Sequence, residues 1–496
     1  MNFTKDKSDL MGIFLLILGL LLFAFLICTV IKMPFISNDE WYTMGIMQLP
    51  LYNIIKVTAG DVHPPMFYII LYGFMSLFKL LSINIDLIYI MKITAMVPYI
   101  LLFILSITKI RKDYGLLTAG VFSFTIIAMS DYFYYFLIGR MYTWPLLFLI
   151  LAFICIKEIL EKRDFKYWLL LTVFSVLAAY SHYFAAIPII LIYLVLLVYL
   201  LLNRNEEFFK PELKNYFISA ILGILCYLPW TFALLNQMKQ VHGSYHITTI
   251  TLDKIIEFFA YYISISNNKF IQLGACIIIL FVFLILMMKY ANTKKAEDFY
   301  ILLGVFAFIA TIGFALMVSF IFRPILTVRY LIPVIGLVWL CISIKLGSVD
   351  FKKIALPIIL LLIVVGAFNV YHEFNDIRGE WSTTVNDKNF LDSINNEDTV
   401  MVYLSTNKYC RFNGYLDNVS EKYSAYVLNN KTSDIGFEGL DLNYDPLVIP
   451  DDLKDYSDKN IYVPMQDTRS PPKGNGFKFT EIAEMQHSKI YKIESK

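Results

Sequence analysis

The chain has 496 residues, of which 58% are hydrophobic, and its 42 Lys and Arg residues nearly balance its 40 Asp and Glu residues. This hydrophobic fraction argues against a chain of several water-soluble domains. No tract of Lys and Arg is dense enough to bind nucleic acid, and the six cysteines form neither a CxxC pair nor a disulfide framework. The composition therefore indicates a multi-spanning membrane protein.

Repeated runs of about twenty residues without a charge, each long enough to cross a bilayer, predict eleven transmembrane helices. The first run has no small-residue cleavage site after it, so we expect a retained span rather than a signal peptide. The predicted spans cover approximately residues 11–32, 87–108, 115–136, 141–159, 167–183, 185–203, 215–235, 270–289, 299–321, 330–346 and 354–370.

A twelfth apolar stretch, residues 66–81, is shorter, and we expect it to form a helix on the membrane surface. With that choice every predicted cytoplasmic loop is basic, as the positive-inside rule requires. If the stretch were a full span, the basic loops would all lie outside. We therefore expect a multi-pass protein of the cell membrane, with its N-terminus in the cytoplasm and its C-terminal part outside the membrane on the extracytoplasmic side.

The C-terminal part differs from the rest in charge and pattern. From Tyr371 to the end it has 14 Lys or Arg against 21 Asp or Glu. Short apolar stretches such as TVMVYLS, SAYVL, PLVIP, NIYVPM and KIYKI alternate there with turns. We therefore expect residues 371–496 to form a small extracytoplasmic α/β domain, in which no nucleotide-binding glycine loop is visible.

The loop after the first span carries an unusual set of polar residues. Asp39 and Glu40 stand side by side, and Asp61 and His63 come directly before Pro64 and Pro65. A deprotonated carboxylate at the membrane surface can take a proton from an attacking hydroxyl, as a general base must. The structural alternative is a solvated helix start, since acidic residues are common near helix N-termini.

Four further polar residues fall on the same predicted side of the membrane, namely Arg140, His182, Arg323 and Arg329. An arginine near the hydrocarbon costs free energy unless it snorkels or binds an anion. A guanidinium can hold two phosphate oxygens at once, which suits a phosphate at the membrane edge. Snorkelling for the arginines, and an interfacial packing role for the histidine, are the alternatives.

These segments resemble those of polytopic glycosyltransferases with the C-type fold, such as dolichyl-phosphate-mannose protein mannosyltransferases and bacterial lipid A aminoarabinose transferases. The Asp-Glu pair and the D-x-H-P-P-M turn are similar to the first external loop of that family. The triplet Arg140-Met141-Tyr142 resembles its third-loop arginine motif, although Ile138 stands where relatives often have a polar residue. The turn around His182 and the sequence Arg329-Tyr330 before an apolar run also match.

The resemblance implies an all-α polytopic domain over residues 1–370, with a catalytic first external loop at 33–86. A further external loop, at 236–269, lies between the seventh and eighth predicted spans. The resemblance also implies a polyprenyl-phosphate sugar donor, either dolichyl or undecaprenyl, with Asp39 as general base and Glu40 in support. Transfer would invert the anomeric carbon. The substrate-binding residues that it implies are Asp61, His63, Arg140, Tyr142, His182, Arg329 and Tyr330.

Several alternatives stay open on the sequence alone. The acceptor can be a glycan, a lipid or a protein, and the C-terminal domain can hold it, cover the catalytic opening or act only as a stabilising cap. Asp61 and His63 are candidate ligands of a divalent metal ion, but two such groups do not make a site. The rival function classes are a transporter or flippase of lipid-linked saccharide, and an inactive assembly subunit.

Overall fold

The computed structural model describes residues 3–244, 250–264, 268–403, 424–428, 445–447, 458–466, 477–485 and 488–495. The described chain divides into two compact units. The first comprises Met1–Lys32, Val62–Phe74 and Ile90–Asn375, and the second Met33–Asp61, Met75–Tyr89 and Asp376–Lys496.

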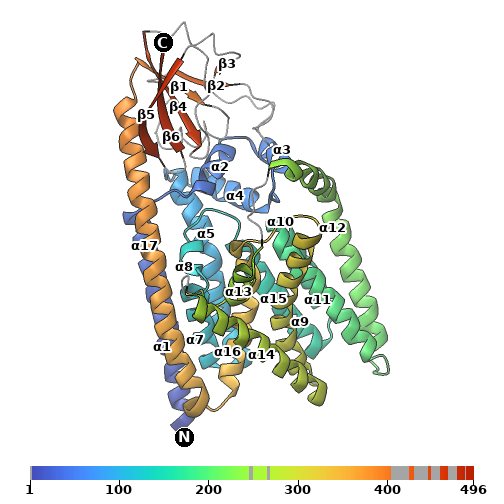
Figure 1. Ribbon diagram of the computed structural model, residues 1–496. Coiled ribbons are helices and arrows are strands. Elements are labelled where there is room, and N and C mark those ends of the chain that lie inside the picture. Colours follow the sequence, from blue (N-terminus) through green and yellow to red (C-terminus); the bar gives the residue numbers. More distant parts are fainter. Residues whose placement is uncertain are drawn as a thin grey trace. The chain divides into compact units, whose positions relative to one another are not determined.

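Helices make up the first unit, and they run roughly parallel or antiparallel to one another (Figure 1). The helices of the chain are α1 Phe3–Lys32, α2 Asn38–Met47, α3 Leu51–Gly60, α4 Met66–Leu80, α5 Leu87–Leu105, η1 Ser106–Ile110, α6 Arg111–Tyr114, α7 Leu116–Ala128, α8 Tyr132–Tyr135, α9 Thr143–Lys162, α10 Phe165–Ser181, α11 Tyr183–Leu202, α12 Phe209–Ser244, α13 Leu252–Ala260, α14 Lys269–Thr293, α15 Ala296–Ile321, η2 Val328–Leu331, α16 Ile332–Ser348, η3 Phe351–Ala355 and α17 Leu356–Ile394.

The predicted spans all correspond to helices, with differences in length. Among the described residues, nine helical segments are long and apolar enough to cross a membrane, while α4, α7 and α10 are shorter apolar helices. The span predicted at 115–136 is divided, because α7 ends at Ala128 and Ser130 and Asp131 both adopt positive φ. The last predicted span continues without interruption to Ile394, so the predicted domain boundary at residue 370 falls inside α17.

Helices α1 and α7 cross at two glycines. A Cβ added to Gly12 would lie 2.4 Å from the carbonyl oxygen of Leu116, and one added to Gly120 would lie 2.3 Å from the carbonyl oxygen of Gly12. Such distances leave no room for a side chain, so the two backbones are in direct contact. Glycine at both positions is therefore what lets α1 pack onto α7.

The second unit contains a six-stranded sheet of order β3-β2-β1-β4-β6-β5. Its strands are β1 Thr399–Tyr403, β2 Ser424–Leu428, β3 Asp445–Leu447, β4 Asn460–Gln466, β5 Phe477–Met485 and β6 Ser488–Ser495. The first four pair in parallel, with Met401 opposite both Ala425 and Tyr462, and β6 pairs antiparallel with β4 and β5. The predicted α/β domain is confirmed, and β5 is a strand that the apolar runs did not indicate.

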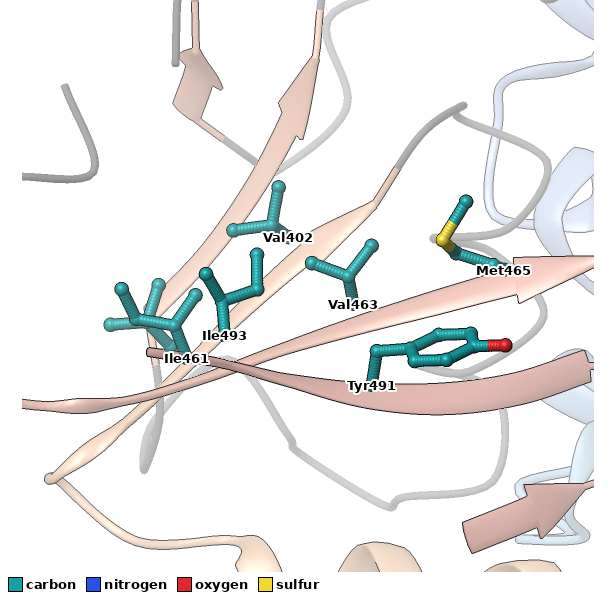
Figure 2. Close-up of a cluster of buried hydrophobic side chains, with 7 residues drawn as sticks. Val402, Ile461, Val463, Met465, Tyr491 and Ile493 are labelled. Carbon is teal, nitrogen blue, oxygen red and sulfur yellow. The ribbon is translucent and has the colours of Figure 1, made fainter. Parts of the chain in front are cut away.

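One face of this sheet buries a cluster of apolar side chains, shown in Figure 2. Val402 of β1, Ile461 and Val463 of β4, and Tyr491 and Ile493 of β6 are each less than 8% exposed. They are alternate residues of their strands, and residues two apart share one face of a sheet. The period-two pattern of the sequence thus produces the core of the domain.

Candidate functional site

The acidic residues of the first loop lie in the second unit. Asp39 and Glu40 are in the first turn of α2, and Asp61 follows the last residue of α3. Glu40 is fully buried, and its Oε2 accepts a hydrogen bond of 2.9 Å from the backbone N–H of Ser37, which precedes the helix. Glu40 thus caps the start of α2, while Asp39 on the same turn is only partly buried.

Helix α2 is held firmly in its unit. Trp41, Thr43 and Ile46 are fully buried, and the backbone N–H of Ile36 donates to Oγ1 of Thr384 on α17 at 3.4 Å. The interpretation of the acidic pair as a solvated helix start therefore does not hold for Glu40.

The other predicted residues come together in the first unit. The imidazole of His182 is at the centre, with ring centroids 6.2 Å from His63, 5.8 Å from Tyr142 and 5.1 Å from Tyr330. The positive charges of Arg140 and Arg329 both act on His182 and His63. We call these six residues the helix-end cluster: His63, Arg140, Tyr142, His182, Arg329 and Tyr330.

Each part of the helix-end cluster precedes the N-terminus of a helix. His63 lies just before α4, Arg140 just before α9 and Arg329 just before α16, while His182 is the N-cap of α11. Free N–H groups and the helix dipole make such ends positive, and together they attract anions. Four helix ends and two guanidinium groups therefore create a strongly positive site.

Arg140 is buried to 97% and is held by a neighbouring helix. Its Nη1 donates a hydrogen bond of 3.0 Å to the hydroxyl of Tyr68, on the first turns of α4. The structure thus supplies an orienting partner in place of the polar residue that Ile138 replaces. A tyrosine so close to the D-x-H-P-P turn was not singled out from the sequence.

His182 is also 97% buried, and its two nitrogens differ. Nδ1 accepts a hydrogen bond of 3.1 Å from the backbone N–H of Phe184. Within the described part of the chain, Nε2 is buried without a hydrogen-bond partner. Burial, followed by the charges of Arg329 and Arg140, lowers the pKa of His182 to about 3. The neutral ring must then carry its proton on Nε2, as a donor available to a ligand.

His63 keeps some exposed surface but is surrounded by protein groups. This burial, and then the charges of Arg140, His182 and Arg329, lower its pKa well below the usual value. The positive charge of the site at neutral pH therefore comes from the two arginines and the helix ends rather than from histidine.

A lysine that the sequence reasoning passed over lies on α5. Lys92 is fully buried, one turn before Ala95, whose carbonyl oxygen accepts a hydrogen bond of 2.9 Å from Oγ1 of Thr143. Lys92 therefore lies one helical turn from the contact between α5 and the start of α9. A single lysine within a predicted span is itself a signal of function, and it could have been read from the sequence.

A metal centre is not apparent among these residues. Within the described ranges, no three or more His, Cys, Asp and Glu residues gather in a way that could hold a metal ion. Nδ1 of His182 is also already engaged by a backbone N–H. The pair Asp61 and His63 stays a prediction, and no step of the chemistry is assigned to a metal.

Comparison with known proteins bears on the fold. No family model matches the sequence, and no curated protein matches it. Among solved structures, the chain is similar to ArnT from Cupriavidus metallidurans bound to undecaprenyl phosphate, with a TM-score of 0.58, 10% identity and 97% of each chain covered. The apo state of ArnT gives a TM-score of 0.56 and 9% identity over the same coverage. The chain therefore has the C-type glycosyltransferase fold of ArnT, as predicted, and is a multi-pass membrane protein.

Proposed function

We propose that the protein is an inverting glycosyltransferase that moves a sugar from a polyprenyl phosphate to an acceptor hydroxyl. The observation that carries this proposal is the convergence of two guanidinium groups and four helix N-termini on the imidazole of His182. This arrangement suits a phosphate group. The undecaprenyl phosphate bound to the ArnT structure supports a lipid-linked phosphate as its natural ligand.

The charge of the helix-end cluster favours the departure of the phosphate. A sugar polyprenyl phosphate is a phosphodiester with one negative charge, and the leaving polyprenyl phosphate approaches two, because its second pKa is about 6. Arg140 and Arg329 therefore interact more strongly with the departing group than with the donor. Interactions that strengthen toward the transition state are the ones that accelerate a reaction.

His182 adds a hydrogen-bond donor to this site. Since Nδ1 is held by the N–H of Phe184, the N–H at Nε2 can donate to a phosphate oxygen without changing its protonation. The sequence left open whether His182 is an interfacial packing residue or orients the phosphate. Its buried Nε2 favours the second role.

Asp39 is the proposed base. Its carboxylate takes the proton of the acceptor hydroxyl while that oxygen bonds to the anomeric carbon, and the bond from this carbon to the phosphate oxygen breaks on the opposite face. The leaving phosphate is a weak base and needs no general acid. Glu40 then has a positioning role, because it caps the turn of α2 that carries Asp39.

The position of the proposed site also bears on the rival function. Transporters place charged residues or broken helices near the middle of the membrane. The helix-end cluster instead gathers at helix termini, as expected for a transferase that works at the membrane edge on a lipid-linked donor. We therefore prefer transfer to flipping.

The decisive experiment supplies a panel of dolichyl- and undecaprenyl-phosphate sugars, each with candidate glycan, lipid and protein acceptors, to the purified protein. Release of polyprenyl phosphate that requires both donor and acceptor is expected for one donor. The Asp39→Asn variant is the control for contaminating enzymes. Failure of every donor to react, with undecaprenyl phosphate itself unbound, contradicts the proposal. Repeating the active reaction with EDTA tests the metal, and we expect turnover to continue.

The proposed orientation puts the first loop outside the cell membrane and the basic loops inside. Tyr52 on α3 is 77% exposed, and Lys112 on α6 is also exposed. In intact cells, a cysteine replacing Tyr52 should react with an impermeant thiol reagent, whereas one replacing Lys112 should react only after lysis. The reverse result would invert the topology.

A further inference from the structure

The chain makes an unusual turn between α7 and α8. Ser130 and Asp131 both adopt left-handed backbone conformations, with φ of 58° and 57°. Two consecutive residues other than glycine in this region are strained, and they persist only where surrounding contacts hold them. The contacts that hold this turn are therefore informative.

Both side chains bind the segment that follows α13. Oγ of Ser130 donates to the carbonyl oxygen of Tyr262 at 2.5 Å. One carboxylate oxygen of Asp131 accepts from the hydroxyl of Tyr261 at 2.8 Å, and the other accepts from the hydroxyl of Ser264. Ser264 is itself left-handed, with φ of 50°. We call these groups the latch: the side chains of Ser130, Asp131, Tyr261 and Ser264, together with the backbone carbonyl of Tyr262.

The latch reaches the helix-end cluster by two routes. Helix α13, which ends at Ala260 just before the latch, packs against η2, the short helix that carries Arg329. The hydroxyl of Tyr261 also lies near the Tyr135 side chain. The ring of Tyr135 lies 5.0 Å from that of Tyr142. The hydroxyl of Tyr135 also interacts electrostatically with Arg329.

We propose that Asp131 is a positioning residue of the helix-end cluster. Through Tyr261 it fixes the end of α13, and through α13 it holds η2 and Arg329 in the geometry that binds the donor phosphate. The identity of that ligand rests on the proposed function, whereas the mechanical link from Asp131 to η2 does not. The segment around α13 thus acts on the phosphate site indirectly, through its packing against η2.

Two adjacent tyrosines provide a matched test. Tyr261→Phe removes the hydroxyl that ties the end of α13 to Asp131. Tyr262→Phe removes a neighbouring buried hydroxyl that instead donates to the carbonyl oxygen of Ala275, on α14, at 3.2 Å. With the full-length purified protein and undecaprenyl phosphate as the probe, Tyr261→Phe should raise the dissociation constant between about twofold and thirtyfold, the range for residues coupled to a site without touching its ligand. Tyr262→Phe should leave it unchanged.

Asp131→Asn extends the test, because asparagine also tolerates the left-handed conformation. It should also weaken binding of undecaprenyl phosphate. Combining it with Tyr261→Phe should add little to the loss, since both changes break the hydrogen bond between Tyr261 and Asp131. An equal loss in the Tyr261 and Tyr262 variants would show general loosening of the segment and overturn the proposal.

Amide hydrogen exchange supplies a readout that needs no ligand. Tyr261→Phe should speed exchange in Val328–Leu331 relative to Tyr262→Phe and to the unsubstituted protein. If the unsubstituted protein does not bind undecaprenyl phosphate, that result counts against the proposed donor alone, and exchange still decides the role of Asp131. Equal exchange in η2 for both variants would overturn the positioning role of Asp131.

Discussion

The helix-end cluster takes its parts from four helix starts that are spread from His63 to Arg329 along the chain, whereas Asp39 and Glu40 share a single turn of α2. The cluster is therefore a product of helix packing, and its positive character belongs as much to backbone N–H groups as to side chains. The acidic pair depends on local capping by Glu40 and on its attachment to α17. Binding and proton transfer should thus respond to different substitutions.

Among the substitutions that separate proton transfer from binding, replacing Asp39 by Asn should have the largest effect on turnover. The variant keeps the shape of the side chain but loses its basicity, so turnover should fall by about 10²- to 10⁴-fold while undecaprenyl phosphate binds as before. Transfer kinetics and lipid-phosphate binding measure the two quantities. Glu40→Gln is the matched control, because a Gln oxygen can still accept from the N–H of Ser37, and it should retain most activity. Turnover by Asp39→Asn close to that of the native protein would remove Asp39 as base.

Substitutions of Arg329 should have the opposite profile. Arg329→Ala should weaken binding of undecaprenyl phosphate by about tenfold to a hundredfold, the loss of a charge-assisted hydrogen bond of 1.5–3 kcal/mol, and Arg329→Lys should recover part of it. Arg323, in the same segment between α15 and α16 but outside the helix-end cluster, provides the control Arg323→Lys. Equal affinity in all three variants would assign Arg329 to snorkelling.

Acid should destabilise the helix-end cluster through His182. Its pKa is about 3 in the folded protein and near 6.5 when unfolded, so below pH 6.5 the unfolded chain binds more protons. Stability contributed by the neutral ring is complete above that pH and falls by about 1.4 kcal/mol per pH unit as pH drops toward 4. His182→Asn keeps an N-cap for α11 and should flatten this dependence of thermal unfolding. The exposed His372 offers the control His372→Asn, and equal slopes for both variants would exclude His182 as the cause.

The smallest effect is expected where α2 meets α17. Thr384→Val leaves the buried N–H of Ile36 without its acceptor, which should lower stability by about 1–3 kcal/mol and reduce turnover more than donor binding. The hydroxyl of the adjacent Thr383 donates within its own helix, to the carbonyl oxygen of Gly379, so Thr383→Val is the matched control. If the two variants lose turnover equally, the bond does not position Asp39.

Much of the membrane fold could be predicted from the sequence because apolar length is a local property. The capping role of Glu40 was not predicted, although its spacing after Ser37 is that of a capping box. The break at Ser130 and Asp131 was missed, since an apolar run conceals a left-handed turn whose hydrogen bonds come from Tyr261 and Ser264. Strand β5 was also missed, because its pattern FKFTEIAEM mixes charged residues into the alternation and contains a register shift near Glu481.

The assembly of the candidate site could be predicted only in part. The individual residues of the helix-end cluster could be named, because ionisable groups between apolar runs are conspicuous. That Tyr68 would hold Arg140, or that His182 would use Nδ1 for capping, depends on contacts between or within turns that no spacing rule encodes. Lys92 shows the converse, since its position in a span was visible and its significance was overlooked.

The glycine crossing of α1 and α7 has a consequence for biosynthesis. The ribosome makes α1 before α7, and the backbone surface that fits against Gly12 belongs to Leu116 and Gly120, which emerge roughly a hundred residues later. Until then the first span has only its own uncharged length to keep it in the bilayer. Gly12→Ala should therefore leave membrane insertion intact and instead trap a late intermediate, in which every helix is inserted and the first has not docked.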